Sequence, residues 1–247
     1  IELKFNEIRT KWTGQEFSFK SWKNRKAPVL VGVAAVIDDL EDSTMTLQTM
    51  LTMRHVEPFQ DEVTNQLHAL ENTTDTLENW MKVQLLWTSL ESVFTGGDIA
   101  KQMPTEAKKF VKVDKEWLKI MTKASNTLNV VECCSNEALQ NTLPLLYVEL
   151  EKCQKSLEGY LMQKRNIFPR FYFVSNPVLL QILSQGSDTS AVQQFYEKMF
   201  DSVSRVKHSE ENSRLITHIQ NLGSSGKDGG SASRNHEVIQ LKTPVMA

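Results

Sequence analysis

The sequence has 247 residues, with 28 Lys and Arg against 30 Asp and Glu, three Cys and 40% apolar residues. This length and composition predict one large globular domain or two smaller ones. The net charge of −2 argues against a dedicated nucleic-acid-binding protein, because binding to phosphates requires a basic excess on at least one face. The sequence has no apolar run of about 18 residues, as a membrane-spanning helix requires, so we expect no membrane partner either.

The cysteines and the N-terminus indicate where such a chain belongs. Cys133 and Cys134 are adjacent and Cys153 stands alone, so the sequence has neither a disulfide framework nor zinc-ligand spacing. Reduced thiols in a cytosolic type of compartment are therefore expected. The sequence begins at Ile1, in the middle of an amphipathic pattern and without the basic and apolar regions of a secretory signal. We expect it to be a segment of a longer protein.

The N-terminal region predicts a helix, a small β-hairpin and a second helix. Apolar residues at helical spacing end at Trp12, and short apolar patterns typical of strands follow at 17–19 and 29–31. Residues 33–51 then carry one apolar stripe with helical spacing. Pro58 limits this helix, because the residue before a proline is disfavoured in the α conformation.

A longer helix is predicted over residues 59–94. It would be about 54 Å long at 1.5 Å per residue. Residues 72–74 are poor helix formers and include a position where the helical pattern requires an apolar residue, so we expect a bend there. Gly96 and Gly97 end this helix, and the apolar stripe of the next one lies within 104–121.

The most regular pattern is a heptad repeat in the middle of the chain. Its apolar positions recur every three or four residues and are Leu139, Leu143, Leu146, Leu150, Cys153, Leu157 and Tyr160. Pro144 lies inside this pattern. Two alternatives follow: a helix with a kink at Pro144, or a helix that begins with Thr142 as its cap and has the proline in its first turn. Phe168 and Pro169 end the helix.

Strands and helices are mixed in the last part of the chain. Residues 171–174 predict a short buried strand, and helices are expected over 176–183 and from about 190 to 200. Residues 215–219 could form a strand or a helix, and 238–241 predict a final strand that pairs with them.

A Gly- and Ser-rich loop, expected to be mobile, occupies 223–235 between these last two segments. The predicted fold class is mainly α, an elongated array of helical bundles with a few short β-strands and hairpins. We divide it into a helix and hairpin at 1–32, a long-helix bundle at 33–166 and a mixed helix and strand segment at 167–247.

Charge is distributed unevenly along the chain. Residues 37–78 contain ten acidic residues and one basic residue, whereas 101–123 contain seven Lys and three acidic residues. Both could be solvated helix faces. Alternatively, they could meet complementary surfaces on a partner or elsewhere in the chain.

Known patterns of catalytic, cofactor-binding and metal-binding residues are not found. The segment Gly223–Asp228 has only two residues between its glycines and ends in Asp, so it does not match a phosphate-binding loop. The five histidines lack metal-ligand spacing, and no serine or cysteine has a nucleophile motif around it. The large aromatic residues are expected in the core, among them Trp80, Trp87, Phe94, Phe110 and Trp117. The chain should therefore act through shape and contact.

Four runs of residues resemble, in this order, the linker region of dynein heavy chains: Val83-Gln84-x-x-Trp87-x-x-Leu90-Glu91-x-x-Phe94, Phe110-x-x-Val113-Asp114-x-x-Trp117-x-x-Ile120-Met121, Ser156-Leu157-x-x-Tyr160-Leu161-x-x-Lys164-Arg165-x-x-Phe168-Pro169-Arg170-Phe171-Tyr172-Phe173-Val174-Ser175-Asn176 and Leu179-Leu180-x-Ile182-Leu183-Ser184. The resemblance covers about residues 17–245. Residues 94–104 are most similar to the gamma-type heavy chain of the ciliary outer arm. The Gly- and Ser-rich stretch before His236 departs from the short turn that dynein linkers usually have.

The resemblance implies a mechanical role. In dyneins the linker is a helical arch across a ring of ATPase modules, and it bends and straightens as nucleotide binds and is hydrolysed in that ring. It implies no enzymatic activity and no cofactor in this segment, with ATP and Mg bound in the ring of the full chain. The implied partners are the AAA+ ring of the same heavy chain, microtubules through the whole motor, and other dynein heavy, intermediate and light chains. The implied location is the cytoplasm and the axoneme of a cilium or flagellum.

Two sets of residues follow from these patterns. The candidate hinge or ring-contact residues are Gly96, Gly97, Phe168, Pro169, Arg170, Phe171, Tyr172, Phe173 and Asn176. The signature residues expected in the core are Gln84, Trp87, Leu90, Phe94, Trp117, Leu157 and Tyr160. The alternative function is a static helical scaffold or adaptor that binds protein partners. Strands near Phe171 and Val238 would argue against a purely helical scaffold.

Overall fold

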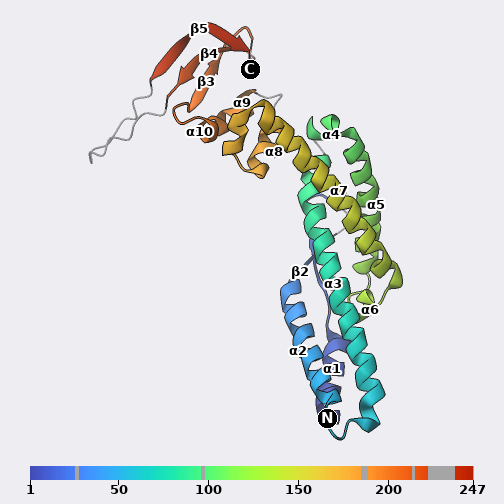
Figure 1. Ribbon diagram of the computed structural model, residues 1–247. Helices are drawn as coiled ribbons and strands as arrows, with labels where there is room; N and C mark the ends of the chain where they lie inside the picture. Colours follow the sequence, from blue (N-terminus) through green and yellow to red (C-terminus); the bar gives the residue numbers. More distant parts are fainter. Residues whose placement is uncertain (26–27, 96–97, 185–188, 213–214, 222–236, 247) are drawn as a thin grey trace, which may run out of the picture. The chain divides into compact units, whose positions relative to one another are not determined.

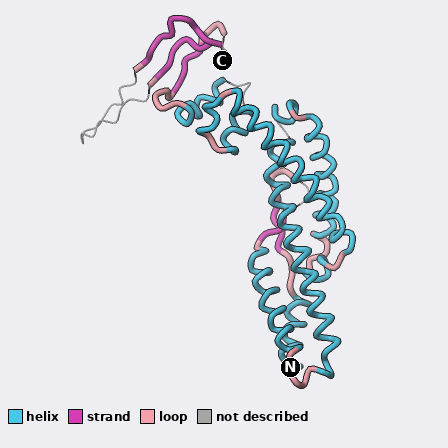
Figure 2. Tube along the Cα trace, viewed as in Figure 1, coloured by secondary structure: helices cyan, strands magenta, loops and turns pink. Residues whose placement is uncertain are grey.

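The computed structural model describes residues 1–25, 28–95, 98–184, 189–212, 215–221 and 237–246 (Figure 1). Within these ranges the chain is mainly helical, with a few short antiparallel strands, as predicted (Figure 2). It divides into a first unit, Ile1–Glu91 with Lys108–Gln154, and a second unit, Ser92–Ala107 with Lys155–Ala247. Each unit is described by itself.

The first unit begins with the predicted helix, hairpin and helix. These are α1 (Glu2–Gly14), the antiparallel strands β1 (Ser18–Ser21) and β2 (Pro28–Val31), and α2 (Val33–Leu51). Trp12 is buried in α1, and its Nε1 donates a hydrogen bond to Ser43 Oγ of α2 at 3.0 Å. This bond satisfies the polar tip of a buried tryptophan and ties the two helices together.

The predicted long helix is α3 (Gln60–Phe94), preceded by the short 3-10 helix η1 (Glu57–Phe59). It continues without interruption through 72–74. Thr73 is buried there, and its hydroxyl donates to the Ala69 carbonyl at 2.7 Å. Thr74 bonds the Leu70 carbonyl in the same way at 3.0 Å. These bonds within the helix satisfy the hydroxyl groups, so threonine can occupy a position where the pattern requires an apolar residue.

Three further helices contribute to the first unit. They are α5 (Pro104–Ala124), α6 (Val130–Cys134), which the sequence pattern did not predict, and α7 (Glu137–Ile167). Helix α7 begins next to Asn136, whose Oδ1 accepts hydrogen bonds from the Ala138 and Leu139 amides at 3.0 and 3.3 Å. Pro144 therefore lies inside the helix, and the alternative with Thr142 as the cap is wrong. The Thr142 hydroxyl instead donates to the Ala138 carbonyl at 2.6 Å.

The core of the first unit contains the aromatic residues that the sequence predicted there. Trp80, Trp87, Phe110 and Trp117 are fully buried. The Trp80 Nε1 donates to Met121 Sδ at 3.2 Å, which joins α3 to α5. The apolar stripe of α7 from Leu139 to Cys153 is buried as well.

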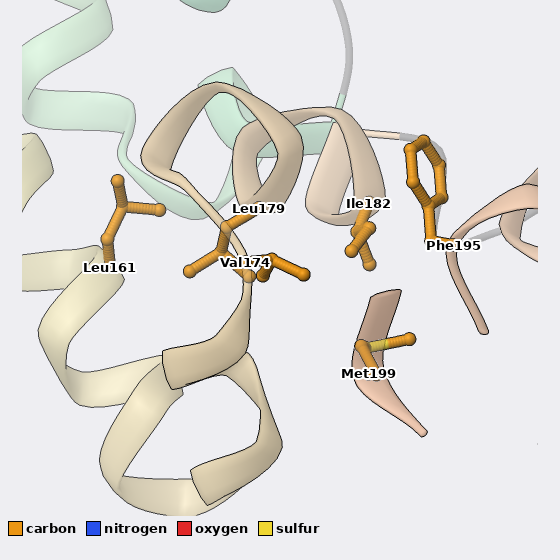
Figure 3. Packing of buried hydrophobic residues seen from close by; sticks show 6 residues of the cluster. All are labelled: Leu161, Val174, Leu179, Ile182, Phe195 and Met199. Atoms are coloured by element: carbon orange, nitrogen blue, oxygen red, sulfur yellow. The ribbon is translucent and has the colours of Figure 1, made fainter. Parts of the chain in front are cut away.

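The second unit contains short helices around one apolar cluster. After α4 (Asp98–Gln102) and the end of α7 come η2 (Pro169–Phe173), α8 (Asn176–Ser184), α9 (Thr189–Val192), η3 (Gln193–Phe195) and α10 (Tyr196–Met199). The buried members of the cluster come from α7, α8, η3, α10 and a residue between η2 and α8, and they are shown in Figure 3: Leu161, Val174, Leu179, Ile182, Phe195 and Met199.

Two predictions for this region are wrong. Residues 171–174 do not form a buried strand: 169–173 form a 3-10 helix with proline at its first position, and Phe173 is 72% exposed. The proline fixes a helical φ angle, and close aromatic spacing alone imitated a strand. The helix expected from about 190 to 200 is instead three short pieces, α9, η3 and α10.

The chain ends in a three-stranded antiparallel sheet with the order β3 (Arg205–His208), β4 (Leu215–Gln220) and β5 (Val238–Met246). The predicted pairing of the last two strands is confirmed, with Ile219 opposite Ile239. Strand β3 was not predicted, and its Val206 is the buried residue of that strand. The expected mobile loop at 223–235 lies outside the described residues.

Candidate functional site

The first candidate site is a clamp between the N-terminal hairpin and the helices α3 and α5. It begins with Gln84, which is buried on α3. The Leu30 amide of β2 donates to Gln84 Oε1 at 2.9 Å, and Gln84 Nε2 donates back to the Leu30 carbonyl at 2.9 Å. One side chain thus satisfies both main-chain groups of a buried strand residue, as a neighbouring strand would.

Charged residues of the hairpin turn extend the clamp. Lys23 Nζ lies 2.5 Å from Glu91 Oε2, and Arg25 Nε lies 3.1 Å from Glu91 Oε1. Arg25 also reaches Asp114 of α5, with Nη1 3.2 Å from Oδ2. Trp87 Nε1 donates to the other Asp114 oxygen at 3.0 Å. Arg25 therefore bridges carboxylates on two helices, and we call Lys23, Arg25, Glu91 and Asp114 with Gln84 the hairpin clamp.

Aromatic rings surround these charges. The Trp87 ring lies 5.7 Å from the Trp117 ring and 6.5 Å from that of Trp22, measured between centroids. The Arg25 guanidinium carbon is 5.9 Å from the Trp87 centroid, within the range of a cation–π contact. The side chains of Arg25 and Asp114 are 23% and 13% exposed, so their ion pair is partly shielded from water, which strengthens the electrostatic interaction.

The electrostatics of Glu91 follow from this arrangement. Burial alone would raise the pKa of Glu91, because desolvation disfavours the charged form. Hydrogen bonds and charges from Lys23 and Arg25 outweigh burial, so the pKa of Glu91 lies below its ordinary value. The carboxylate is 6% exposed and carries its charge in the folded protein. Lys23 adopts a left-handed backbone conformation with φ 47°, which is uncommon for a residue other than glycine.

The second candidate site is the segment 168–176 of the second unit. Arg165 of α7 donates from Nε to the Phe171 carbonyl at 3.3 Å and from Nη2 to the Val174 carbonyl at 3.2 Å. Arg170 Nη1 donates to the Met199 carbonyl at 3.2 Å, and its guanidinium carbon lies 4.5 Å from the Phe200 ring centroid. Two arginines therefore hold this segment against α7 and α10.

Large apolar side chains are exposed in this segment and at Ile167, the last residue of α7. Ile167 is 77% exposed, Phe173 72% and Tyr172 54%. The Tyr172 hydroxyl bonds Asn166 Oδ1 at 2.9 Å, which orients its ring at the surface. A group of exposed apolar residues next to a well-held turn is typical of a protein contact surface.

The other sequence-predicted residues lie in different places. Leu90, Phe94 and Leu157 are buried, and Tyr160 is half-buried. Burial raises the pKa of Tyr160, whose hydroxyl donates to Gln102 Oε1. Gly96 and Gly97 lie outside the described residues. Pattern analysis missed Lys23 and Arg25, because basic residues in a turn do not indicate which carboxylates they will meet. The two carboxylates that Arg25 binds lie 66 and 89 residues further along the chain.

Other kinds of site were also considered. Among the described residues, no three His, Cys, Asp or Glu side chains form a group that could hold a metal ion. None of the described helices combines the length and apolar character needed to cross a membrane. Cys133, Cys134 and Cys153 are buried, and they form no disulfide within the described residues.

Comparison with known proteins places the chain in a family. The family described as "Dynein heavy chain, N-terminal region 2" matches residues 1–247. The chain is 44% identical over 250 residues to Dynein axonemal heavy chain 5 of Rattus norvegicus, which covers 100% of the chain and 7% of that protein. It is 38% identical over 252 residues to the Dynein gamma chain, flagellar outer arm, of Chlamydomonas reinhardtii, covering 100% of the chain and 5% of that protein.

The chain is mainly helical within its described residues and matches this family over its whole length. The chain belongs to the dynein heavy-chain family and corresponds to part of its N-terminal region. It spans less than a tenth of the length of these relatives.

Proposed function

We propose that this chain is part of the linker of an axonemal dynein heavy chain and acts as its mechanical lever. The observation that carries the proposal is the family match over residues 1–247, together with 38–44% identity to axonemal and flagellar outer-arm heavy chains. The full chain would hydrolyse ATP with Mg in its AAA+ ring, and this segment would contribute no catalytic residue. Its place would be the axoneme of a cilium or flagellum.

The long helices support a force-transmitting role. Helix α3 has 35 residues and α7 has 31, or about 52 and 46 Å at 1.5 Å per residue. Each helix carries buried apolar residues along its length, and packed interiors resist compression. The hairpin clamp adds polar bonds between α3, α5 and β2, so a load on one element is shared by the others. These features suit an element that transmits displacement.

The remaining partners follow from the same proposal. The lever would work against the AAA+ ring of its own heavy chain and move microtubules through the whole motor, next to other heavy, intermediate and light chains. The segment 168–176 would be its hinge or ring contact, since it joins α7 to α8 and exposes Tyr172 and Phe173. Gly96 and Gly97 remain a second hinge candidate.

The experiment is a microtubule-gliding assay of the full heavy chain with Phe171→Ala. Phe171 packs on the apolar cluster and its ring meets that of Phe168 with centroids 4.9 Å apart. We expect slower gliding at an unchanged ATPase rate, because the turn would yield under load. Leu85→Ala is the matched control, since Leu85 is 71% exposed on α3. Normal velocity at a normal ATPase rate would contradict the hinge assignment.

A static scaffold is the second candidate. The terminal sheet β3–β4–β5 argues against a purely helical scaffold. The second strand expected to distinguish the lever from such a scaffold, at 171–174, is not formed. A scaffold would tolerate Phe171→Ala without loss of velocity.

A further inference from the structure

Helix α5 of the first unit carries a row of lysines on its solvent side. Its buried residues include Phe110, Trp117 and Met121, which face the core with α3. The exposed residues Lys108, Lys112, Lys115, Lys119 and Lys123 fall within about 80° of the helix circumference at 100° per residue. This row, the lysine stripe, is about 22 Å long at 1.5 Å per residue and lies opposite the buried face.

The lysine stripe differs from an ordinary solvated helix face. On α3 and α7 exposed lysines are paired along the helix, as Lys82 is with Glu78 at 3.5 Å and Lys152 with Glu149 at 2.6 Å. On the stripe Lys119 has such a partner, Glu116 at 2.7 Å. Within the described part of the chain, the other four stripe lysines have no carboxylate oxygen within 4.0 Å.

The sequence spacing makes this pattern unfavourable for the isolated helix. Successive stripe lysines are three or four residues apart, where like charges face each other and destabilise a helix. Val111 is 45% exposed beside the row. A surface that combines unneutralised charge with exposed apolar area fits a partner of opposite charge.

A cleft of about 300 Å³ opens at the C-terminal end of the stripe. It lies between α5, α6 and α7 and is lined by Lys119 and Lys123, with Ile120, Ala124 and Leu139 providing apolar surface. Glu116 and Glu132 also line it, and the first of these is already paired with Lys119. A single apolar side chain such as leucine could enter this cleft while carboxylates lie along the stripe.

We propose that the lysine stripe and its cleft bind an acidic segment of a separate protein subunit, with carboxylates at helical spacing and one apolar anchor residue. The cleft favours a polypeptide over a nucleic acid or a membrane. It lies beside the stripe and has an apolar lining, so one apolar side chain of a polypeptide can enter it while neighbouring carboxylates bind the lysines.

The test uses the full heavy chain and a fluorescein-labelled, helix-forming peptide of 15 residues, with Glu at every third or fourth position and one Leu near its end. Binding is followed by fluorescence anisotropy. We expect K112E/K115E to weaken binding at least tenfold. The matched control is K4E/K20E, which makes the same charge change at two exposed lysines of the same unit and should leave binding within twofold.

The altered helix should fold, because both positions are exposed and the buried face of α5 is unchanged. The new carboxylates lie four residues from Lys108 and Lys119, and these favourable pairs offset the repulsion between the two carboxylates and that with Glu116. A peptide with Lys in place of Glu should not bind the unaltered chain, because like charges repel. The peptide with Gln in place of Glu should not bind, and Ser in place of Leu should weaken binding about fivefold.

Three results would overturn the proposal. They are equal binding by K112E/K115E and K4E/K20E, binding of the Gln peptide at the same affinity, and binding of the Lys peptide to the unaltered chain. If a 20-nucleotide single-stranded DNA or phosphatidylserine vesicles bind more tightly through the same lysines, the partner is a nucleic acid or a membrane and the proposed polypeptide partner is wrong. The proposal does not depend on the lever role, so its failure would leave that role standing.

Discussion

Gln84 on α3 holds Leu30 on β2 by two reciprocal hydrogen bonds of 2.9 Å, one from the Leu30 amide and one to the Leu30 carbonyl. Both residues are buried. The hairpin is therefore attached to the long helix through its main chain, independently of which side chains the strand carries. The same α3 region also supplies Trp87 and Glu91 to the clamp.

Replacement of Gln84 by Met should loosen the hairpin. It keeps the volume but leaves a buried amide and a buried carbonyl unpaired, at about 1–3 kcal/mol each. We expect the free energy of local opening at Leu30 to fall by about 2–4 kcal/mol, so that amide hydrogen exchange of residues 28–36 in the full heavy chain accelerates by about 30-fold or more. Gln48→Met, at an exposed position on α2, is the control. Similar exchange in both variants would show that the reciprocal bonds contribute little.

Replacement of Glu91 by Gln should release the hairpin turn. The variant removes the charge that both Lys23 and Arg25 approach, and leaves the half-buried Arg25 with Asp114 alone. Chymotrypsin should then cleave after Trp22 about five to ten times faster than in the unaltered heavy chain. Glu78→Gln changes an exposed carboxylate on the same helix that lies 3.5 Å from Lys82, and should change cleavage less than twofold. Equal cleavage of the two variants would contradict the clamp.

The pH dependence of thiol alkylation provides a prediction about burial. Burial, together with the neighbouring Glu132 carboxylate, raises the pKa of Cys133 from 9.0 to about 11. Since the thiolate reacts, alkylation of Cys133 by iodoacetamide at pH 8 should be about 100-fold slower than that of a thiol with the ordinary pKa. The rate should keep rising about tenfold per pH unit beyond pH 9. Mass spectrometry of the alkylated peptide measures this rate. A plateau of the rate near pH 9 would contradict the raised pKa of Cys133.

Phe173→Asp should separate contact from folding in the segment 168–176. Phe173 is 72% exposed, so the substitution should leave hydrogen exchange of residues 169–183 unchanged. If this surface meets the ring, microtubule gliding should slow severalfold, because a charge would enter an apolar contact. The control is Leu3→Asp, at a residue 83% exposed on α1. Normal gliding by the Phe173 variant would exclude a contact through this residue.

Periodicity predicted most of the helices because each buries one stripe, as Val33–Leu51 and Pro104–Ala124 do. It failed where local pattern and tertiary contacts diverge. In 169–173 a proline and two arginine-bound carbonyls produce a 3-10 turn, although the aromatic alternation resembled a strand. Asn136 starts α7 earlier than the alternative with Thr142 as the cap supposed, because its capping bonds outweigh the cost of a proline inside the helix.

The clamp shows a different limit of sequence reasoning. Gln84, Trp87, Glu91, Asp114 and Trp117 stood out through the resemblance to dynein linkers, but Lys23 and Arg25 of the hairpin turn did not. Arg25 joins residues 66 and 89 positions away, and no spacing rule connects a turn residue to two distant helices. The contacts that hold the hairpin are therefore findings of the structure alone.

The lever role itself is tested most directly by distance changes within the motor. Met45 is 62% exposed on α2, so a fluorescent unnatural amino acid there should leave the first unit folded. An acceptor on the AAA+ ring of the same full heavy chain then reports the separation by energy transfer. Our account predicts that the transfer efficiency differs between the nucleotide-free motor and the motor with ATP and vanadate. An unchanged efficiency in both states, with normal ATPase activity before vanadate is added, would contradict the lever and favour a static scaffold.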